Sequence, residues 1–448
     1  MNSPVHLPGK TERLDLALRS ETLGDAASIL ADMSPGDVAY LIASSPPDLR
    51  DTLLGLLAPE QEALVVNELP EELRNAALID RAPEALAEIV EQLDDDDSAD
   101  ILHELPEDIT GRVLAIMDEQ YRQRLQTVLS FPDDVAGGLM STDTITIRAD
   151  LTLDVVLRYL RRHAELPSNT DSLIVVNRSD RYVGLLPIST LVVSDPAISV
   201  REMMITDQQA IDAEVPAAEV AHRFERNDWV SAPVINSEGK LLGRITIDDV
   251  VDVIMEEADH SLTSLAGLAE EDTFATVWHS APRRAVWLGI NLGTALLASS
   301  VINLFQDTIE KVVALAVLMP IVASMGGIAG TQSLTILIRA MAMGQITHRN
   351  QLWLVGRESL VGVLNGCFWA VVIAATTALW FGDSTLGLII ACAMLINLVT
   401  AGLAGAGLPI ILRRLDVDPA LAGGVLVTTI TDVIGFLTFL GLATLFYA

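Results

Sequence analysis

The sequence predicts a multidomain protein: an all-α superhelical N-terminal domain, a repeated α/β module, a connecting helix and an α-helical transmembrane domain with five spans. Three observations lead to this prediction. Charge is divided unevenly, with 20 basic and 53 acidic residues before Ala281 but eight basic and seven acidic residues from there onward. Prolines recur roughly every twelve residues near the N-terminus. Apolar stretches long enough to cross a bilayer fill the C-terminal part.

Residues 1–132 are predicted to form short stacked helices. Proline is favoured in the first turn of a helix, and acidic residues are favoured beside it. The two occur together at six predicted helix starts: Pro35, Pro47, Pro59, Pro70, Pro83 and Pro106. Short helices repeated in this way stack into a superhelix. The acidic run Asp94–Asp97, with Asp100 one turn later, is typical of a solvated helix start, but it also offers oxygen ligands for a low-affinity divalent-ion site.

Residues 133–257 contain an internal repeat. The segment 173–177 is similar to 232–236, and 182–186 is similar to 241–245, both at an offset of 59 positions. Residues upstream are offset by 64, which predicts an extra loop near Pro167–Asp171 in the first copy. Each copy is expected to fold as strand, helix, strand, strand, helix. The repeat resembles a tandem pair of CBS domains, and this resemblance implies a regulatory module with weak grounds for an ATP site.

The last helix of the second copy carries more acids than its counterpart. Asp248 and Asp249 replace Ser189 and Thr190 of the first copy, and all four suit helix capping. Only the second helix continues with acids: Asp252, Glu256, Glu257 and Asp259. Adjacent like charges on one helix face repel unless a cation lies between them. We therefore predict that this helix senses divalent cations.

Residues 258–282 are predicted to form a helix that connects the acidic module to the transmembrane domain, residues 283–448. The expected spans are Ala285–Phe305, Val312–Ile338, Leu360–Phe381, Leu386–Leu412 and Leu421–Tyr447. Glycines cluster in the second and fourth spans, and they predict close contact between helices. The two cysteines, Cys367 and Cys392, lie in apolar stretches and are expected to be small buried side chains.

Charges in the loops predict the orientation. The loops expected in the cytoplasm carry arginines: Arg283, Arg284, Arg339, Arg349, Arg357, Arg413 and Arg414. The opposite loops carry Asp307, Glu310 and Asp383 with a single lysine. The positive-inside rule then places the N-terminal domains in the cytoplasm and, after five spans, the C-terminus outside. The polar N-terminus contains no apolar core of a secretory signal. We therefore expect a multi-pass protein of the cell (inner) membrane, surrounded by membrane lipid.

Asp432 lies inside an otherwise uncharged apolar stretch, Val425–Tyr447. A carboxylate at that depth costs several kcal/mol unless it meets water, a cation or a partner. Thr428 precedes it by one turn on the same helix face. Gln332 follows the glycines of the second span and is a candidate lining residue. Oxygen donors suit hard cations such as Mg²⁺, held through their water shell. Two symmetric copies would double the negative field, so we expect a homodimer with its pore near the two-fold axis.

With these residues identified, the chain resembles the MgtE family of magnesium channels over nearly its whole length. The resemblance rests on these segments: 136–140, 320–333, 416–420 and 429–435. It implies a homodimeric magnesium channel with Asp432 as its pore aspartate and a cytosolic part that Mg²⁺ closes. It also implies that Asp96, Asp97 and Asp100 join the acids of the second repeat in sensing the ion. Ile328 stands where many members carry asparagine.

The composition excludes some classes of function and leaves others open. An acidic surface disfavours nucleic acid as a partner. No phosphate-binding loop, nucleophile elbow or metal-hydrolase spacing is present, so an enzyme is not expected. Two alternatives to a channel stay open. One is a secondary transporter that exchanges a divalent cation for protons or sodium, with Asp432 carrying the proton. The other is a nucleotide-sensing membrane protein without transport of its own.

Overall fold

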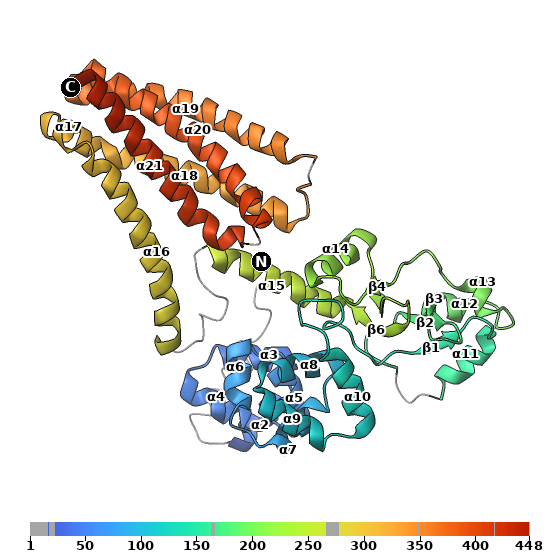
Figure 1. Ribbon diagram of the computed structural model, residues 1–448. Coiled ribbons are helices and arrows are strands. Elements are labelled where there is room, and N and C mark those ends of the chain that lie inside the picture. Colours follow the sequence, from blue (N-terminus) through green and yellow to red (C-terminus); the bar gives the residue numbers. More distant parts are fainter. Residues whose placement is uncertain are drawn as a thin grey trace. The chain divides into compact units, whose positions relative to one another are not determined.

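The computed structural model describes Ala17 and residues 23–162, 166–265, 277–347, 349–415 and 417–447. The chain divides into two compact units, Met1–Met255 and Glu256–Ala448. The first holds the short helices and both sheets, and the second holds the long apolar helices (Figure 1).

Short helices make up the N-terminal part of the first unit: α2 (Leu23–Ala31), α3 (Pro35–Ala43), α4 (Pro47–Leu54), α5 (Pro59–Asn67), α6 (Glu71–Leu78), α7 (Pro83–Val90), α8 (Asp95–Glu104), α9 (Glu107–Ile116) and α10 (Glu119–Val128). All six predicted starts are confirmed, because each helix begins at its proline or directly after it. Helices pack on the next but one in sequence, α3 on α5, α5 on α7 and α7 on α9, as a superhelix requires.

The repeat folds into two matching halves of the first unit. The first half comprises β1 (Thr146–Arg148), α11 (Leu153–Leu160), β2 (Ser172–Val176), β3 (Tyr182–Pro187) and α12 (Ile188–Val193). After the short α13 (Val200–Met203), the second half comprises β4 (Ile211–Asp212), α14 (Ala217–Asn227), β5 (Ser231–Ile235), β6 (Leu241–Thr246) and α15 (Ile247–Leu265). Both sheets have one parallel and one antiparallel pairing, in the orders β1-β2-β3 and β4-β5-β6. The predicted element order is therefore confirmed in both copies.

Five helices of the second unit are long and apolar enough to span a membrane: α16 (Val277–Asn303), α18 (Ala314–Ala342), α19 (Gln351–Phe381), α20 (Ser384–Arg414) and α21 (Pro419–Tyr447). A short helix, α17 (Gln306–Lys311), joins the first two. In the predicted connecting region, α15 extends to Leu265, whereas residues 266–276 lie outside the described part of the chain.

Helix α20 is the centre of the second unit. More than half of its apolar stretch, 56%, is buried, against 33% or less in the other spans, and it packs on α18, α19 and α21. Glycines allow the close approach, because a Cβ on Gly405 would overlap the Gly330 carbonyl oxygen and one on Gly402 would lie 2.7 Å from the Glu358 carbonyl oxygen. The predicted glycine-mediated packing is confirmed at these two positions. Helix α18 is continuous through Pro320 and its glycines.

One prediction about the spans is wrong. Cys367 and Cys392 are both exposed on the surface of the single chain, not buried. The apolar sequence around them does not distinguish a helix face that packs on protein from one that faces outward, since both faces are apolar in a membrane protein.

Candidate functional site

A pocket of about 550 Å³ opens on the surface of the second unit, between α18 and α21. Its lining comes from those two helices alone: Ala323, Ser324, Gly327, Ile328, Thr331, Gln332, Thr428 and Asp432. Beside the pocket, Gly326, Gly330 and Ser333 are among the residues of α18 that pack inward and are buried. The helical repeat therefore turns the neighbouring residues Gly327 and Thr331 outward into the pocket.

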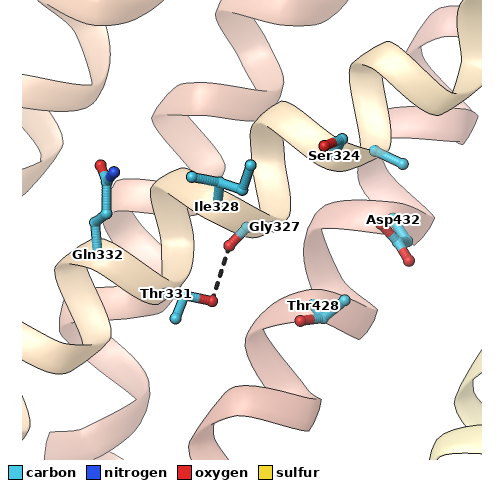
Figure 2. A pocket seen from close by; sticks show the side chains of 8 residues that line it. Ser324, Gly327, Ile328, Thr331, Gln332, Thr428 and Asp432 are labelled. Atoms are coloured by element: carbon cyan, nitrogen blue, oxygen red, sulfur yellow. Dashed lines mark hydrogen bonds between the residues drawn. The ribbon is translucent and has the colours of Figure 1, made fainter.

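Asp432 and Thr428 lie one turn apart on α21 and face the pocket together (Figure 2). The Thr428 hydroxyl donates to the Gly424 carbonyl oxygen at 3.0 Å, and the Thr331 hydroxyl donates to the Gly327 carbonyl oxygen at 2.9 Å. Because both protons are engaged, the hydroxyl oxygens present lone pairs outward. Together with the carboxylate they offer acceptors to the water shell of a cation.

Gln332 is less closely associated with this group. It contributes to the lining, but its amide points away from Asp432 and Thr428 (Figure 2). Ile328, 56% exposed, occupies the lining between Ser324 and Thr331. The one charged side chain of the pocket therefore lies on α21, whereas α18 contributes glycine, hydroxyl, amide and apolar groups.

A second, acidic pocket of about 140 Å³ lies within the first unit. It is lined by Asn67, Glu68, Asp94, Asp96, Asp97, Ser141, Asp143, Pro167, Ser168, Arg244, Thr246, Asp248, Asp249 and Asp252. Helix α8 supplies acids from one side and the start of α15 supplies acids from the other. Next to this pocket, the Thr142 hydroxyl donates a hydrogen bond to the Asp95 carboxylate. The Arg124 side chain forms an ion pair with the same carboxylate.

Burial sets the protonation of the central acids. Asp96 is 7% exposed, and one of its carboxylate oxygens has no hydrogen-bond partner within the described residues. Its pKa is raised well above the ordinary value by burial and by the charges of Asp249 and Asp97. Burial likewise raises the pKa of Asp97 to about 6 and that of Asp249 to about 6. Proton binding or cation binding therefore stabilises this cluster, because either one offsets the negative charge of the buried acids.

The structure brings together some of the predicted sensing residues and not others. Asp96, Asp97, Asp248, Asp249 and Asp252 share the acidic pocket. Asp100, one turn further along α8, is not part of its lining. The remaining three, Glu256, Glu257 and Asp259, are exposed on the part of α15 that belongs to the second unit.

Other lining residues were not predicted. Glu68 and Asp143 add two more acids, and the extra loop of the first repeat copy adds Pro167 and Ser168. Arg244, 6% exposed, donates to the carbonyl oxygens of Ser168 and Asn169 and so fixes that loop. The loop itself was visible as a break in the repeat spacing. Glu68 and Asp143 carry no local signal, because they reach the pocket only through tertiary folding.

No group of three or more His, Cys, Asp or Glu side chains forms a ready coordination shell in the described part of the chain. The acidic pocket nevertheless fits a hard divalent cation by its chemistry. Its donors are oxygens, and one buried carboxylate oxygen of Asp96 lacks a partner among the described residues. A cation held through its water shell, or bound after small side-chain shifts, is consistent with both the lack of a ready coordination shell and the oxygen-rich lining.

Comparison with known proteins assigns each part of the chain. Residues 319–442 match the MgtE family, described as a divalent cation transporter, and residues 22–134 match the MgtE intracellular N domain. Residues 135–194 and 200–256 match the CBS domain. The chain is 31% identical to the magnesium transporter MgtE of Bacillus subtilis, over 97% of this chain and 96% of that protein. It is 32% identical to the MgtE of Thermus thermophilus, over 78% and 79% of the two chains.

Solved structures give the same assignment for the first unit. The crystal structure of the cytosolic domain of the Mg²⁺ channel MgtE in complex with ATP is 31% identical, with a TM-score of 0.50, and covers 54% of this chain and 98% of that one. The soluble part of a magnesium transporter, 20% identical with a TM-score of 0.50, has the same fold over 56% of this chain and 100% of that one. The chain belongs to the MgtE family, a family of membrane transporters and not of enzymes.

Proposed function

We propose that this protein is a Mg²⁺-selective channel that admits the ion through the pocket between α18 and α21. The observation that carries the proposal is the group of outward oxygen acceptors around Asp432, which is the one charged side chain of the long apolar helix α21. An acid at such a position is costly unless it handles a charge. The curated relatives along most of the chain are magnesium transporters, which supports Mg²⁺ as the ion.

The pore is proposed to form between two copies of the chain. The pocket is open to the surface of the single chain, so one copy would enclose only one side of the pore. A second copy placed by two-fold symmetry would face Asp432 with its own Asp432 and enclose a hydrated ion. Membrane lipid would cover the remaining apolar faces. Nucleic acid is not a proposed partner, since the soluble part is strongly acidic.

The acidic pocket is proposed to close the channel when cytosolic Mg²⁺ is high. Bound Mg²⁺ would offset the repulsion among the acids of α8 and α15 and hold the two together. Helix α15, which continues into the second unit, is the proposed route from the pocket to the membrane domain. The first unit is proposed to lie in the cytoplasm and the C-terminus outside the inner membrane. A solved relative of the first unit binds ATP, and we propose the CBS pair as the ATP site here.

Magnesium flux into liposomes tests the role of Asp432. Removal of one charge close to the ion loses about 1 to 4 kcal/mol of attraction, depending on the local dielectric constant. We therefore expect Asp432→Asn and Asp432→Ala to reduce flux about tenfold or more. The effect of Thr428→Ala should be smaller, and that of Gln332→Ala smallest, because its amide points away. Unchanged flux in a folded Asp432→Asn protein would contradict the proposal, and strict dependence on a proton gradient would favour an exchanger.

A further inference from the structure

A buried amide joins the two helices that form the proposed pore pocket. Asn397 lies on α20, is 0% exposed, and donates from Nδ2 to the Val322 carbonyl oxygen of α18 at 2.8 Å. Neither Asn397 nor α20 contributes to the pocket lining. The side chain is therefore placed behind the pocket, at the meeting point of three helices.

Two glycines make room for this amide, one on each wall helix. A Cβ added to Gly326 of α18 would overlap the Asn397 amide nitrogen, and its three nearest atoms would all belong to Asn397. A Cβ added to Gly435 of α21 would lie 2.8 Å from the same nitrogen. Gly326 directly precedes the lining residue Gly327, and Gly435 follows Asp432 by less than one turn. The Asn397 amide is thus packed against the backbone of both α18 and α21.

Packing alone does not explain an amide at this position. The Asn397 Oδ1 atom is buried and has no hydrogen-bond partner in the part of the chain that the structure describes. Leaving a buried acceptor unpaired destabilises a fold, and an apolar side chain of the same shape avoids that cost. A leucine has the same branched shape, although its two methyl groups are larger than the amide nitrogen and oxygen. What leucine cannot supply is the hydrogen bond to Val322, which fixes α18 against α20.

We propose that Asn397 is a positioning residue for ion passage. Its hydrogen bond and its contacts with Gly326 and Gly435 set the separation and register of α18 and α21. Since the pocket is lined by these two helices alone, their spacing sets the distance between Thr331 on one wall and Asp432 on the other. The spacing of the oxygen groups that one copy presents to a hydrated ion follows from that distance. This inference rests on the proposed function of the pocket.

The first test is Asn397→Leu in the full chain, with Mg²⁺ and Ca²⁺ flux into liposomes measured as half-saturating concentration and maximal rate. We expect a folded protein, because leucine removes the unpaired buried acceptor while its larger methyl groups press on Gly326 and Gly435. We also expect the half-saturating Mg²⁺ concentration or the Mg²⁺ to Ca²⁺ flux ratio to change by about 2- to 30-fold, as for residues that couple to a site without touching it. A folded Asn397→Leu protein with unaltered ion affinity and selectivity would overturn the proposal.

A second test separates space filling from positioning. Gly326→Ala alone should destabilise the protein, and adding Asn397→Ala should remove the overlap and recover thermal stability. If the hydrogen bond positions the helices, the double variant stays altered in ion affinity and selectivity despite its stability. Recovery of both stability and ion handling would mean that Asn397 only fills space. Gly441→Ala, where an added Cβ meets nothing within 4 Å, is the matched control.

Failure of this inference can be told apart from failure of the proposed function. Asp432→Asn is measured in the same liposomes. If it leaves flux unchanged, the pocket is not the ion path and the proposed function fails together with the positioning role. If it abolishes flux while Asn397→Leu and the double variant conduct normally, only the positioning role of Asn397 is overturned.

Discussion

At the scale of single residues, the structure shows how one residue type is used in opposite environments. Asp432 faces an open pocket within an apolar domain, whereas Asp96 is buried among other acids of the soluble unit. Asp383 is different again, because it caps α20 by accepting from the backbone of Thr385 and Leu386 and also accepts from the Tyr447 hydroxyl at 2.5 Å. Both oxygens of the Asp383 carboxylate therefore accept hydrogen bonds, whereas one oxygen of Asp96 has no partner among the described residues.

The acidic pocket predicts a pH dependence. The pKa values of Asp96, Asp97 and Asp249 are raised in the folded unit, to about 6 for the last two. The folded state therefore binds protons more tightly than the unfolded chain does, and this contribution to stability is lost as pH rises through about 6. Without divalent cations, amide hydrogen exchange of α8, corrected for intrinsic rates, should be slower at pH 5 than at pH 7.5.

Two comparisons control for this effect. The triple variant Asp96→Asn/Asp97→Asn/Asp249→Asn should show a much smaller difference in α8 protection between the two pH values, because the three acids whose pKa values are raised most are gone. Millimolar Mg²⁺ should protect α8 at pH 7.5 in the unsubstituted protein, since the cation replaces the protons. Equal protection of α8 at both pH values without Mg²⁺ would show that these acids are not repulsive in the folded unit.

At the scale of elements, the packing of the membrane helices depends on where a glycine faces. Gly405 and Gly407 lie on the same helix, two positions apart. An added Cβ on Gly405 would meet the Gly330 carbonyl oxygen and lie 2.9 Å from the Ser333 Cβ, whereas one on Gly407 would meet nothing within 4 Å. The Gly330 backbone could make room for a Cβ on Gly405 only if α18 moved away from α20.

Gly405→Ala is therefore expected to destabilise the membrane domain by about 1–3 kcal/mol, the usual cost of overpacking. Gly407→Ala should be neutral or slightly stabilising, because alanine favours helix more than glycine. The midpoint of thermal unfolding in detergent, followed by tryptophan fluorescence, measures both. Equal midpoints for the two variants would mean that the α18 and α20 contact is not as close as the structure shows.

At the scale of the whole molecule, the two units are joined by one helix, α15, whose acidic start belongs to the first unit and whose end belongs to the second. Any signal from the acidic pocket to the pore has this covalent route. A ligand shifts a conformational equilibrium only if it binds one state more tightly. The proposed gating therefore requires a closed state that holds Mg²⁺ more tightly than the open one.

Limited proteolysis of the full protein in detergent measures this linkage. With Mg²⁺ removed by chelation, the acids of α8 and α15 repel, and the soluble unit should be cleaved faster. Millimolar Mg²⁺ should slow cleavage, and a neutralised pocket, Asp96→Asn/Asp249→Asn, should be cleaved at similar rates with and without the ion. Equal cleavage of the unsubstituted protein under both conditions would argue against gating by Mg²⁺ at this pocket.

The amino-acid sequence by itself determined the features that depend on neighbouring residues. Helix starts at prolines such as Pro35 and Pro83, the order of helices and strands in both repeat copies and the five apolar spans are all local, and each was predictable. The shared helix face of Asp432 and Thr428 was predictable for the same reason, since it follows from helical periodicity.

Only the tertiary structure decided which distant residues meet. Glu68 and Asp143 join the acidic pocket, Gln332 turns away from Asp432, and Asn397 enters the space left by Gly326 and Gly435. Such contacts depend on the packing of whole helices and loops against one another, and no pattern within a few residues specifies them.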